Sequence, residues 1–205
     1  MRGFFITFEG IDGAGKTTQQ HLAAQALREQ GYDVLESREP GGTQLAEKVR
    51  ALVLDPELPL TTATQTLLYL AARSEHVDKL LRPALEAGKI IICDRFNDST
   101  LVYQGLAQGK APEEIAQLRR LGAFATGGLE PDLTLVFDAD PAELLARRQQ
   151  RGVQGLEFQQ RLRAGFLQLA EAEPQRLQVI DALGTQQEVT AKVLQVIGRV
   201  ISGEK

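Results

Sequence analysis

The chain of 205 residues is 43% hydrophobic and 24% charged, a composition typical of a globular protein with one sizeable core. Its net charge of -4 excludes the strongly positive field that nucleic acids and anionic membranes attract, and no apolar run approaches the ~18 residues of a membrane span. A single cysteine, Cys93, excludes an internal disulfide and fits a reducing cytosol. We therefore expect one domain over residues 1–205, soluble and cytoplasmic, with neither a nucleic acid nor a membrane as partner.

The first half of the chain alternates short apolar runs with amphipathic segments. Ile90, Ile91 and Ile92 stand together, so their run is apolar on both faces, as expected of a buried parallel strand. Pro83 is expected to interrupt the longest helix of this half. In chain order, the predicted elements are a strand over residues 4–9, a helix closed by Gly31, a strand over 32–37, helices over 45–54 and 61–86, and a strand over 89–93.

The second half continues the same alternation. Asp140 and Pro141 have the residue types of a helix N-cap and first helical position. The predicted elements are helices over residues 98–104 and 113–121, a strand over 133–137, helices over 141–150 and 158–171, a strand over 177–181 and a helix over 188–201. Strands that alternate with helices predict an α/β fold, a five-stranded parallel sheet with helices on both sides.

A phosphate-binding loop is predicted between the first strand and the first helix. Gly10-x-x-x-x-Gly15-Lys16-Thr17 is the Walker A pattern of the P-loop NTPase fold, in the strand-to-helix context that the motif requires. Glycines let the backbone wrap around phosphates, Lys16 supplies a positive charge to the β- and γ-phosphates, and Thr17 offers a hydroxyl to Mg²⁺. We expect ATP to contact residues Gly10, Ile11, Asp12, Gly13, Ala14, Gly15, Lys16, Thr17 and Thr18.

Arginines outside the loop should then decide which kind of nucleotide-binding protein this is. The chain has no Asn-Lys-x-Asp tetrapeptide, which disfavours a GTPase, and a motor would usually be larger. Arg95 follows the third strand, at the edge where α/β sheets bind ligands, and its guanidinium can hold an oxyanion bidentately. Arg38 and Arg73 come from neighbouring segments and can converge on the same phosphate or on a base.

Five segments, in register over the first half of the chain, carry a family resemblance. They are residues 8–18 (FEGIDGAGKTT), 38–43 (REPGGT), 68–73 (LYLAAR), 94–96 (DRF) and 99–105 (STLVYQG). In these segments the chain resembles the bacterial-type thymidylate kinases, a family of P-loop nucleoside monophosphate kinases, and the helix–strand pattern of the remainder is similar. The resemblance implies transfer of a phosphoryl group from ATP to dTMP, which yields ADP and dTDP, in a protein that is commonly a homodimer.

The resemblance also implies an acceptor site for dTMP. It places Arg38 and Arg95 near the acceptor phosphate, with Arg50 as a further candidate, and Arg73 near the base. Tyr69, where most relatives have phenylalanine, would stack on thymine one helical turn before Arg73. The expected dTMP-binding residues are Asp12, Arg38, Pro40, Arg50, Tyr69, Arg73, Arg95, Thr100, Tyr103 and Gln104.

Within that set, three residues of the predicted helix over 98–104 have separate expected roles. Gln104 carries an amide that can pair with the thymine edge, and Thr100 lies one turn earlier on the same helix. Tyr103 resembles the residue that crowds the ribose 2′ position and so favours deoxyribose.

A carboxylate inside an anion-binding loop needs an explanation of its own. In similar proteins an acid at the position of Asp12 lies near the acceptor's sugar hydroxyl and phosphate, so we expect Asp12 to point away from the donor phosphates and to position the acceptor. Asp94 resembles the Walker B acid and, with Thr17, is the expected Mg²⁺ site. Because the acceptor phosphate is already a nucleophilic oxyanion, no general base is required.

An arginine-rich lid is predicted at about residues 147–157. The loop itself lacks an arginine, whereas Arg147, Arg148 and Arg151 follow the fourth strand's helix, close before Gly152 and Gly155. With Lys16, Asp12 and Arg95, we expect Arg147 and Arg151 to be catalytic, delivering positive charge to the transferring phosphoryl group. Similar proteins usually continue with an acidic stretch that is shortened here, so which arginine enters the site, and whether Glu157 replaces the missing acid, stays open.

Two other functions remain open on the residues alone. Another P-loop kinase would act on a different nucleotide or on a deoxynucleoside, although a nucleoside would not need both Arg38 and Arg95. A regulatory module that binds nucleotide and switches a partner is disfavoured by the intact Lys16, Thr17 and Asp94.

Overall fold

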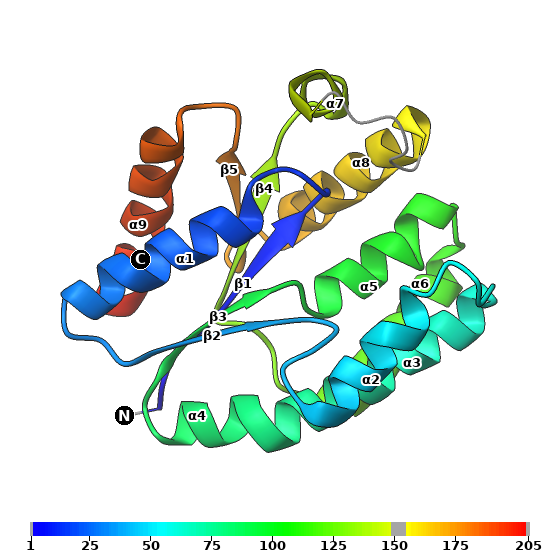
Figure 1. Cartoon of the computed structure of the whole chain (residues 1–205), viewed down its shortest axis with the longest axis horizontal. Helices are drawn as coiled ribbons and strands as arrows, with labels where there is room; N and C mark the ends of the chain where they lie inside the picture. Colours follow the sequence, from blue (N-terminus) through cyan, green and yellow to red (C-terminus); the bar gives the residue numbers. More distant parts are fainter. Residues whose placement is uncertain (1, 149–154, 204–205) are drawn as a thin grey trace.

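Five parallel strands lie side by side at the centre of the molecule, in the order β2-β3-β1-β4-β5 (Figure 1). The structure is a computed structural model that describes residues 2–148 and 155–203. Among these residues, no helix combines the length and the apolar character of a membrane span. The strands are β1 (Phe5–Gly10), β2 (Val34–Arg38), β3 (Ile90–Asp94), β4 (Leu133–Asp138) and β5 (Leu177–Asp181).

The helices lie on both faces of this sheet. α1 and α9 cover one face, whereas α4, α5 and α8 pack against the other, and α2, α3 and α6 form a further layer beside α5 (Figure 1). The helices are α1 (Lys16–Glu29), α2 (Gln44–Val53), α3 (Thr62–His76), α4 (Arg82–Glu86), α5 (Asn97–Tyr103), α6 (Pro112–Thr126), α7 (Pro141–Arg148), α8 (Leu156–Ala172) and α9 (Gln186–Ser202), with a π-helical turn η1 (Val77–Leu81) and a 3₁₀ turn η2 (Leu106–Gln108).

The central strand β1 is buried along its whole length because it has a strand on each side and helices on each face. Phe8 lies opposite Asp94 of β3, and Gly10 lies opposite Phe137 of β4. The carboxyl ends of three adjacent strands therefore meet at one level, which places the loop after β1 beside the residues that follow β3 and β4.

All five predicted strands are confirmed, with ends that differ from the predicted ones by at most two residues. Where the structure describes them, the predicted helices also form; residues 149–150 of the helix predicted over 141–150 lie outside the described residues. α6 continues beyond the predicted end at residue 121 to Thr126. Gly122 lies inside this longer helix, and a side chain would not fit there, because a Cβ would come 2.3 Å from Asn97 Oδ1 where α6 packs on the start of α5.

The interruption expected near Pro83 takes the form of the π-helical turn η1. A proline has no N–H, and its ring collides with the carbonyl four residues earlier, so a regular helix cannot continue unchanged through it. Directly before Pro83, the N–H of Arg82 reaches back five residues to the carbonyl of Val77, the wider spacing of a π-helix. The backbone thus remains helical from Thr62 to Glu86 with one widened turn.

Candidate functional site

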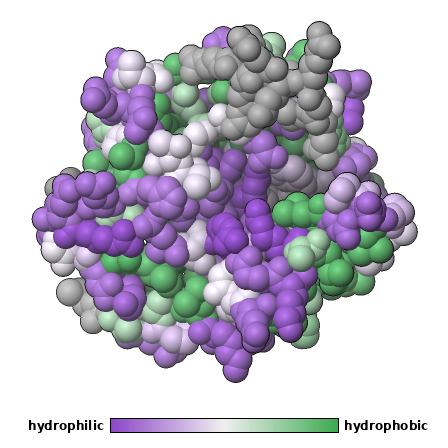
Figure 2. All heavy atoms as spheres, in the orientation of Figure 1, coloured by the Kyte–Doolittle hydropathy of each residue, from purple (hydrophilic) through white to green (hydrophobic). Residues whose placement is uncertain are grey.

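Every strand ends at the same edge of the sheet, and four of the five end in a charged residue. The last residues of β1 to β5 are Gly10, Arg38, Asp94, Asp138 and Asp181. Ligands of open α/β sheets bind outside the carboxyl ends of the strands. In the space-filling view, hydrophilic residues occupy most of the middle of the face shown (Figure 2).

The loop between β1 and α1 owes its conformation to glycines. A Cβ on Gly10 would lie 2.6 Å from the Phe137 carbonyl oxygen, and its φ of 131° is unfavourable for other residues. Gly13 and Gly15 also have positive φ, at 95° and 86°, and Gly15 is the N-cap of α1. This places the unpaired amides at the start of α1 next to the loop, an arrangement suited to binding phosphate.

Lys16, the first residue of α1, points back into this loop. Its Nζ donates hydrogen bonds to the carbonyl oxygens of Gly10, at 3.1 Å, and Ile11, at 2.8 Å. Burial, followed by the positive charge of Arg95, lowers the pKa of Lys16 from 10.5 to about 8. The ammonium is therefore still the major form at neutral pH.

Thr17, at the start of α1, and Asp94, at the end of β3, provide adjacent oxygen atoms. Thr17 Oγ1 donates to Asp94 Oδ2 at 2.7 Å, whereas the buried Asp94 Oδ1 has no hydrogen-bond partner among the described residues. A hydroxyl and a carboxylate are hard oxygen ligands of the kind that Mg²⁺ takes, and Mg²⁺ commonly needs only one or two protein carboxylates beside phosphate and water. The described part of the chain has no cluster of three or more His, Cys, Asp or Glu side chains that could hold a metal ion by themselves.

The carboxylate of Asp12 faces a cation from another part of the chain. Arg95 Nη2 donates to Asp12 Oδ1 at 2.5 Å, and Arg95 Nη1 donates to Ser99 Oγ at 3.0 Å. Arg95 has a left-handed backbone with φ 72°, and its N–H donates to the Phe8 carbonyl at 2.9 Å. The guanidinium therefore bridges the loop after β1 and the start of α5.

Tyr103 and Gln104 lie at the end of α5. The Arg95 guanidinium carbon lies 5.0 Å from the centroid of the Tyr103 ring, within the range of a cation–π contact. Burial raises the pKa of Tyr103 from 10.0 to about 12, so its hydroxyl stays protonated, and this buried oxygen has no hydrogen-bond partner within the described chain. Gln104, also buried, is the C-cap of the helix.

Glu9, which we did not predict as a site residue, fixes the start of α5. Its Oε1 accepts hydrogen bonds from the N–H groups of Phe96, at 2.8 Å, and Ser99, at 3.1 Å, and its Oε2 accepts from Ser99 Oγ at 2.6 Å. Because α5 has no side-chain cap of its own, a carboxylate from β1 takes that role. The sequence signal was a charged residue in a largely apolar strand, directly before the loop.

Tyr69 of α3 lies near two of the predicted arginines, Arg95 and Arg50. Burial raises the pKa of the Tyr69 hydroxyl, while the charges of Arg95, Arg50 and Asp12 also act on it. Arg50 Nη1 in turn donates to the Pro40 carbonyl at 3.0 Å, and the Glu39–Pro40 peptide bond is cis. Residues predicted from four separate segments are thus brought together.

Arg38 has a partner that the sequence did not indicate. Its Nη1 and Nη2 donate to the two oxygens of Glu47, each at 3.0 Å, and Glu47 Oε1 also accepts from the N–H of Gly42 at 3.0 Å. The hydrogen bond from Gly42, followed by the charge of Arg38, holds the pKa of Glu47 below its usual value. Arg38 therefore lies against α2 and the glycine turn.

Arg73 is almost completely buried, and α5 surrounds much of its guanidinium. Nε donates to Glu39 Oε2 at 2.6 Å, Nη1 to Thr100 Oγ1 at 2.9 Å and to Asn97 Oδ1 at 3.1 Å, and Nη2 to the Phe96 carbonyl at 2.9 Å. The described residues accept four of its five N–H donors. Arg73 and Thr100, predicted to belong to one site, are therefore in direct contact.

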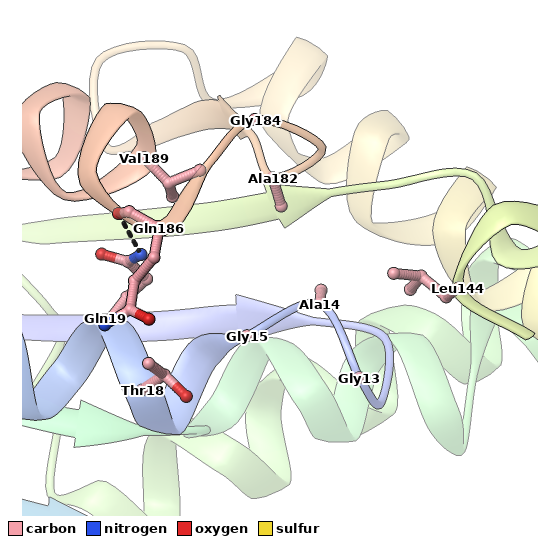
Figure 3. Close-up of a pocket in the computed structure, with 10 residues that line it drawn as sticks. All are labelled: Gly13, Ala14, Gly15, Thr18, Gln19, Leu144, Ala182, Gly184, Gln186 and Val189. Atoms are coloured by element: carbon pink, nitrogen blue, oxygen red, sulfur yellow. Dashed lines mark hydrogen bonds between the residues drawn. The ribbon is translucent and has the colours of Figure 1, made fainter. Parts of the chain in front are cut away.

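A cavity of about 320 Å³ lies between the loop after β1, α7 and the start of α9 (Figure 3). Ala14 of the loop, Leu144 of α7 and Ala182 after β5 line it, together with Gly184 and the start of α9. Gln19 of α1 closes the side near α9 through a hydrogen bond from its Nε2 to the Gln186 carbonyl, at 3.1 Å. We did not predict this cavity, because its walls come from segments more than 100 residues apart.

The predicted lid lies largely outside the described residues. This applies to Arg151 and to the side chains of Arg147 and Arg148, although both of these lie in the backbone of α7. The start of α7 is held by Asp140, whose Oδ1 accepts from the Ala142 N–H at 2.7 Å. Glu157 is exposed on α8 and pairs with Arg161 at 2.7 Å.

A second contact anchors α8 beside the start of α7. Arg163 donates two hydrogen bonds to Asp138, at 2.6 and 2.9 Å, and lies 3.5 Å from Asp140. The carboxyl end of β4, the N-cap of α7 and the middle of α8 are thereby joined.

Comparison with known proteins gives a consistent result over nearly the whole chain. The family model described as thymidylate kinase matches residues 8–193. Thymidylate kinase of Synechococcus sp. (strain JA-3-3Ab) is 50% identical, with 94% of each chain covered. Thymidylate kinase of Symbiobacterium thermophilum is 45% identical over 96% of this chain and 94% of that protein.

A solved structure shows the same similarity in three dimensions. The crystal structure of thymidylate kinase from Ehrlichia chaffeensis superposes with a TM-score of 0.78 at 38% identity, over 96% of this chain and 100% of that chain. The P-loop fold predicted from the sequence is confirmed by this match.

Proposed function

Because the chain belongs to the thymidylate kinase family, it phosphorylates dTMP to dTDP with ATP as donor, and we propose that the groups at the carboxyl edge of the sheet carry out this reaction. The contact between Asp12 and Arg95 carries the proposal, because it joins the predicted donor loop to the residues of α5.

On the donor side, we assign the triphosphate of ATP to residues 10–18 and its adenosine to the cavity beside them. The loop amides and Lys16 match the charge of the phosphates, and the start of α1 adds the positive end of its dipole. Ala14, Leu144 and Ala182 provide apolar walls for a flat base.

Thr17 and Asp94 are the proposed Mg²⁺ ligands. The buried and unpaired Oδ1 of Asp94, next to an oxygen that already binds the Thr17 hydroxyl, fits an ion that takes few protein oxygens. When bound there, Mg²⁺ supplies charge neutralisation on the β- and γ-phosphate oxygens.

On the acceptor side, we propose that Arg95 binds the phosphate of dTMP. It lies over Tyr103 and next to Asp12, so the deoxyribose would lie between these residues, with its 3′-hydroxyl donating to the Asp12 carboxylate. Tyr69 stacks on thymine, and Arg73 and Gln104 lie at its polar edge. Arg38, Arg50, Pro40 and Thr100 complete the proposed site around them.

The chemistry then needs positioning and charge, but no base. A phosphate oxygen of dTMP forms a bond to the γ-phosphorus of ATP, the bond from that phosphorus to the bridging oxygen breaks, and ADP leaves with the electron pair. Lys16 neutralises the donor phosphates and Arg95 holds the attacking phosphate in line. Arg147 or Arg151 would add a cation to the transferring group.

The remaining proposals concern assembly and location. We propose that the protein, a single domain over its 205 residues, acts in the cytoplasm as a homodimer. Phe124 of α6, 88% exposed, and Leu67 of α3, 59% exposed, lie on two helices in contact and offer an apolar surface for a second copy. Sedimentation should show a dimer that Phe124→Asp weakens, and a monomeric wild-type protein would refute this assembly.

The first test of the reaction is ADP release from Mg-ATP with dTMP, dUMP, dCMP, dGMP, AMP and thymidine as acceptors. We expect strong preference for dTMP. Preference for another monophosphate would refute the acceptor-base assignment, and ATP binding without transfer to any acceptor would refute the catalytic one.

A further inference from the structure

Four buried side chains form a continuous hydrogen-bonded chain behind the proposed acceptor site. His76 lies in the middle: its Nε2 is 2.6 Å from Ser37 Oγ, and its Nδ1 is 3.0 Å from Glu39 Oε1. The other oxygen of Glu39 accepts from Arg73 Nε at 2.6 Å. The chain therefore runs from β2 to α3, the helix that carries Tyr69 and Arg73.

The order Ser37–His76–Glu39 has the hydrogen-bond arrangement of a hydrolase triad, but burial makes that chemistry impossible here. Ser37 is 9% exposed, Glu39 6% and His76 0%. The backbone of Gly42 also covers the chain, because a Cβ there would lie 2.7 Å from the His76 ring and 2.9 Å from Ser37 Oγ. No substrate can approach the serine, so the chain holds other groups in place.

The charge of the Glu39 carboxyl group determines which ring nitrogen of His76 carries a hydrogen. Burial would raise the pKa of this carboxyl group, but the charge of Arg73 and the hydrogen bond from His76 outweigh it, and the pKa is lowered. An ionised carboxylate only accepts hydrogen bonds, so Nδ1 of His76 must carry the hydrogen. One oxygen of Glu39 is thus held by His76 and the other by Arg73.

Arg73 is held from two directions as a result. Glu39 holds Nε, while Asn97, Thr100 and the Phe96 carbonyl of the α5 segment accept three further N–H donors. No described residue accepts a hydrogen bond from the second N–H of Nη2. The direction of this N–H depends on the contacts that hold the rest of the guanidinium. Removing the support of Glu39 should therefore rotate the whole guanidinium.

We propose that His76 is a positioning residue for recognition of the acceptor base, acting through Glu39 on the remaining N–H of Arg73. This inference rests on the proposed placement of Arg73 at the base of dTMP. An N–H donor pairs with the O4 oxygen of thymine but not with the N4 amino group of cytosine. The ratio of kcat/KM for dTMP to that for dCMP is therefore the quantity that His76 controls.

Two amide variants of His76 differ in length and therefore in which contact they keep. The shorter His76→Asn keeps an N–H near Nδ1 for Glu39, and the longer His76→Gln reaches towards Ser37 but leaves Glu39 without its donor. We expect His76→Gln to lower the dTMP/dCMP ratio about tenfold and His76→Asn to keep it within about threefold, because only the first loses a buried hydrogen bond to a charged group. The KM for ATP should be unchanged in both variants.

Glu39→Gln provides a second test should a His76 variant fail to fold, and it should lower the same ratio because a neutral amide no longer orients the guanidinium. Folded His76→Gln or Glu39→Gln protein with the wild-type ratio would overturn the inference. A lower melting temperature alone would not rescue it, since a loss of packing would explain that result.

Arg73→Lys separates the two proposals. An unchanged dTMP/dCMP ratio in this variant would refute the base-reading role of Arg73. A lower ratio in Arg73→Lys but not in His76→Gln would refute only the role of His76.

Discussion

Replacing Glu9 by glutamine should change how the stability of this protein depends on pH. Glu9 is completely buried and accepts three hydrogen bonds from Phe96 and Ser99 at the start of α5. The glutamine oxygen can accept the two backbone N–H groups, and the side-chain volume is nearly unchanged. The substitution therefore removes chiefly the titrating charge.

The magnitude follows from the pKa of Glu9. Burial, followed by the negative charge of Asp98, raises this pKa from 4.5 to about 7, although Arg95 and the hydrogen bonds oppose the rise. Between these two values the folded protein keeps a proton that the unfolded chain has released, so the contribution of Glu9 to stability is largest below pH 4.5 and is lost as the pH rises through 7. At about 1.4 kcal/mol for each pKa unit, the loss is about 3 kcal/mol.

Urea unfolding of both proteins between about pH 4.5 and pH 8 measures this effect. The free energy of unfolding of Glu9→Gln, relative to wild type, should rise by about 3 kcal/mol across that range, because groups common to both proteins cancel. Glu157→Gln, which removes an exposed glutamate paired with Arg161, is the matched control, and its difference should vary by less than about 1 kcal/mol, the contribution of an exposed ion pair. A variation equally small for Glu9→Gln would refute the raised pKa.

Three further predictions concern the loop and its neighbour. Gly10→Ala should lower the free energy of unfolding by about 2–4 kcal/mol, since its Cβ would collide with the Phe137 carbonyl; urea unfolding beside Gly198→Ala, where a Cβ meets nothing, checks this. Asp12→Asn should reduce kcat with dTMP about tenfold or more while ATP affinity stays within about twofold; unchanged steady-state kinetics would remove Asp12 from the acceptor site. Arg95→Ala should reduce kcat/KM for dTMP by about 10²–10³ through loss of a phosphate-binding cation, and unaltered KM and kcat would contradict its assignment.

Local patterns in the sequence were sufficient to predict most of the secondary structure. Strand and helix periodicity depends on residues close together in the chain, which is why the five strands were predicted nearly to the residue. The glycine spacing of the loop has the same local origin, since positive φ at Gly13 and Gly15 is a property of each residue's own backbone. Even the break near Pro83 followed from the missing N–H of one residue.

Prediction was less successful where a residue's behaviour depends on a distant neighbour. α6 continues through Gly122, where the Asn97 amide leaves no room for a side chain, and helix propensity does not encode that contact. In the same way, the pairing of Arg38 with Glu47 became visible only when β2 and α2 were placed together, whereas the role of Arg38 as a phosphate ligand stays a prediction.

The α/β architecture, the phosphate loop and the family could all be read from short segments, because strong local constraints act on each of them. The partners of the charged groups could not, since they come together through tertiary packing: Asp12 with Arg95, Glu9 with the start of α5, and Glu39 between Arg73 and His76. These pairings depend on which strand ends and helix faces meet, and that is set by packing of the whole chain around β1.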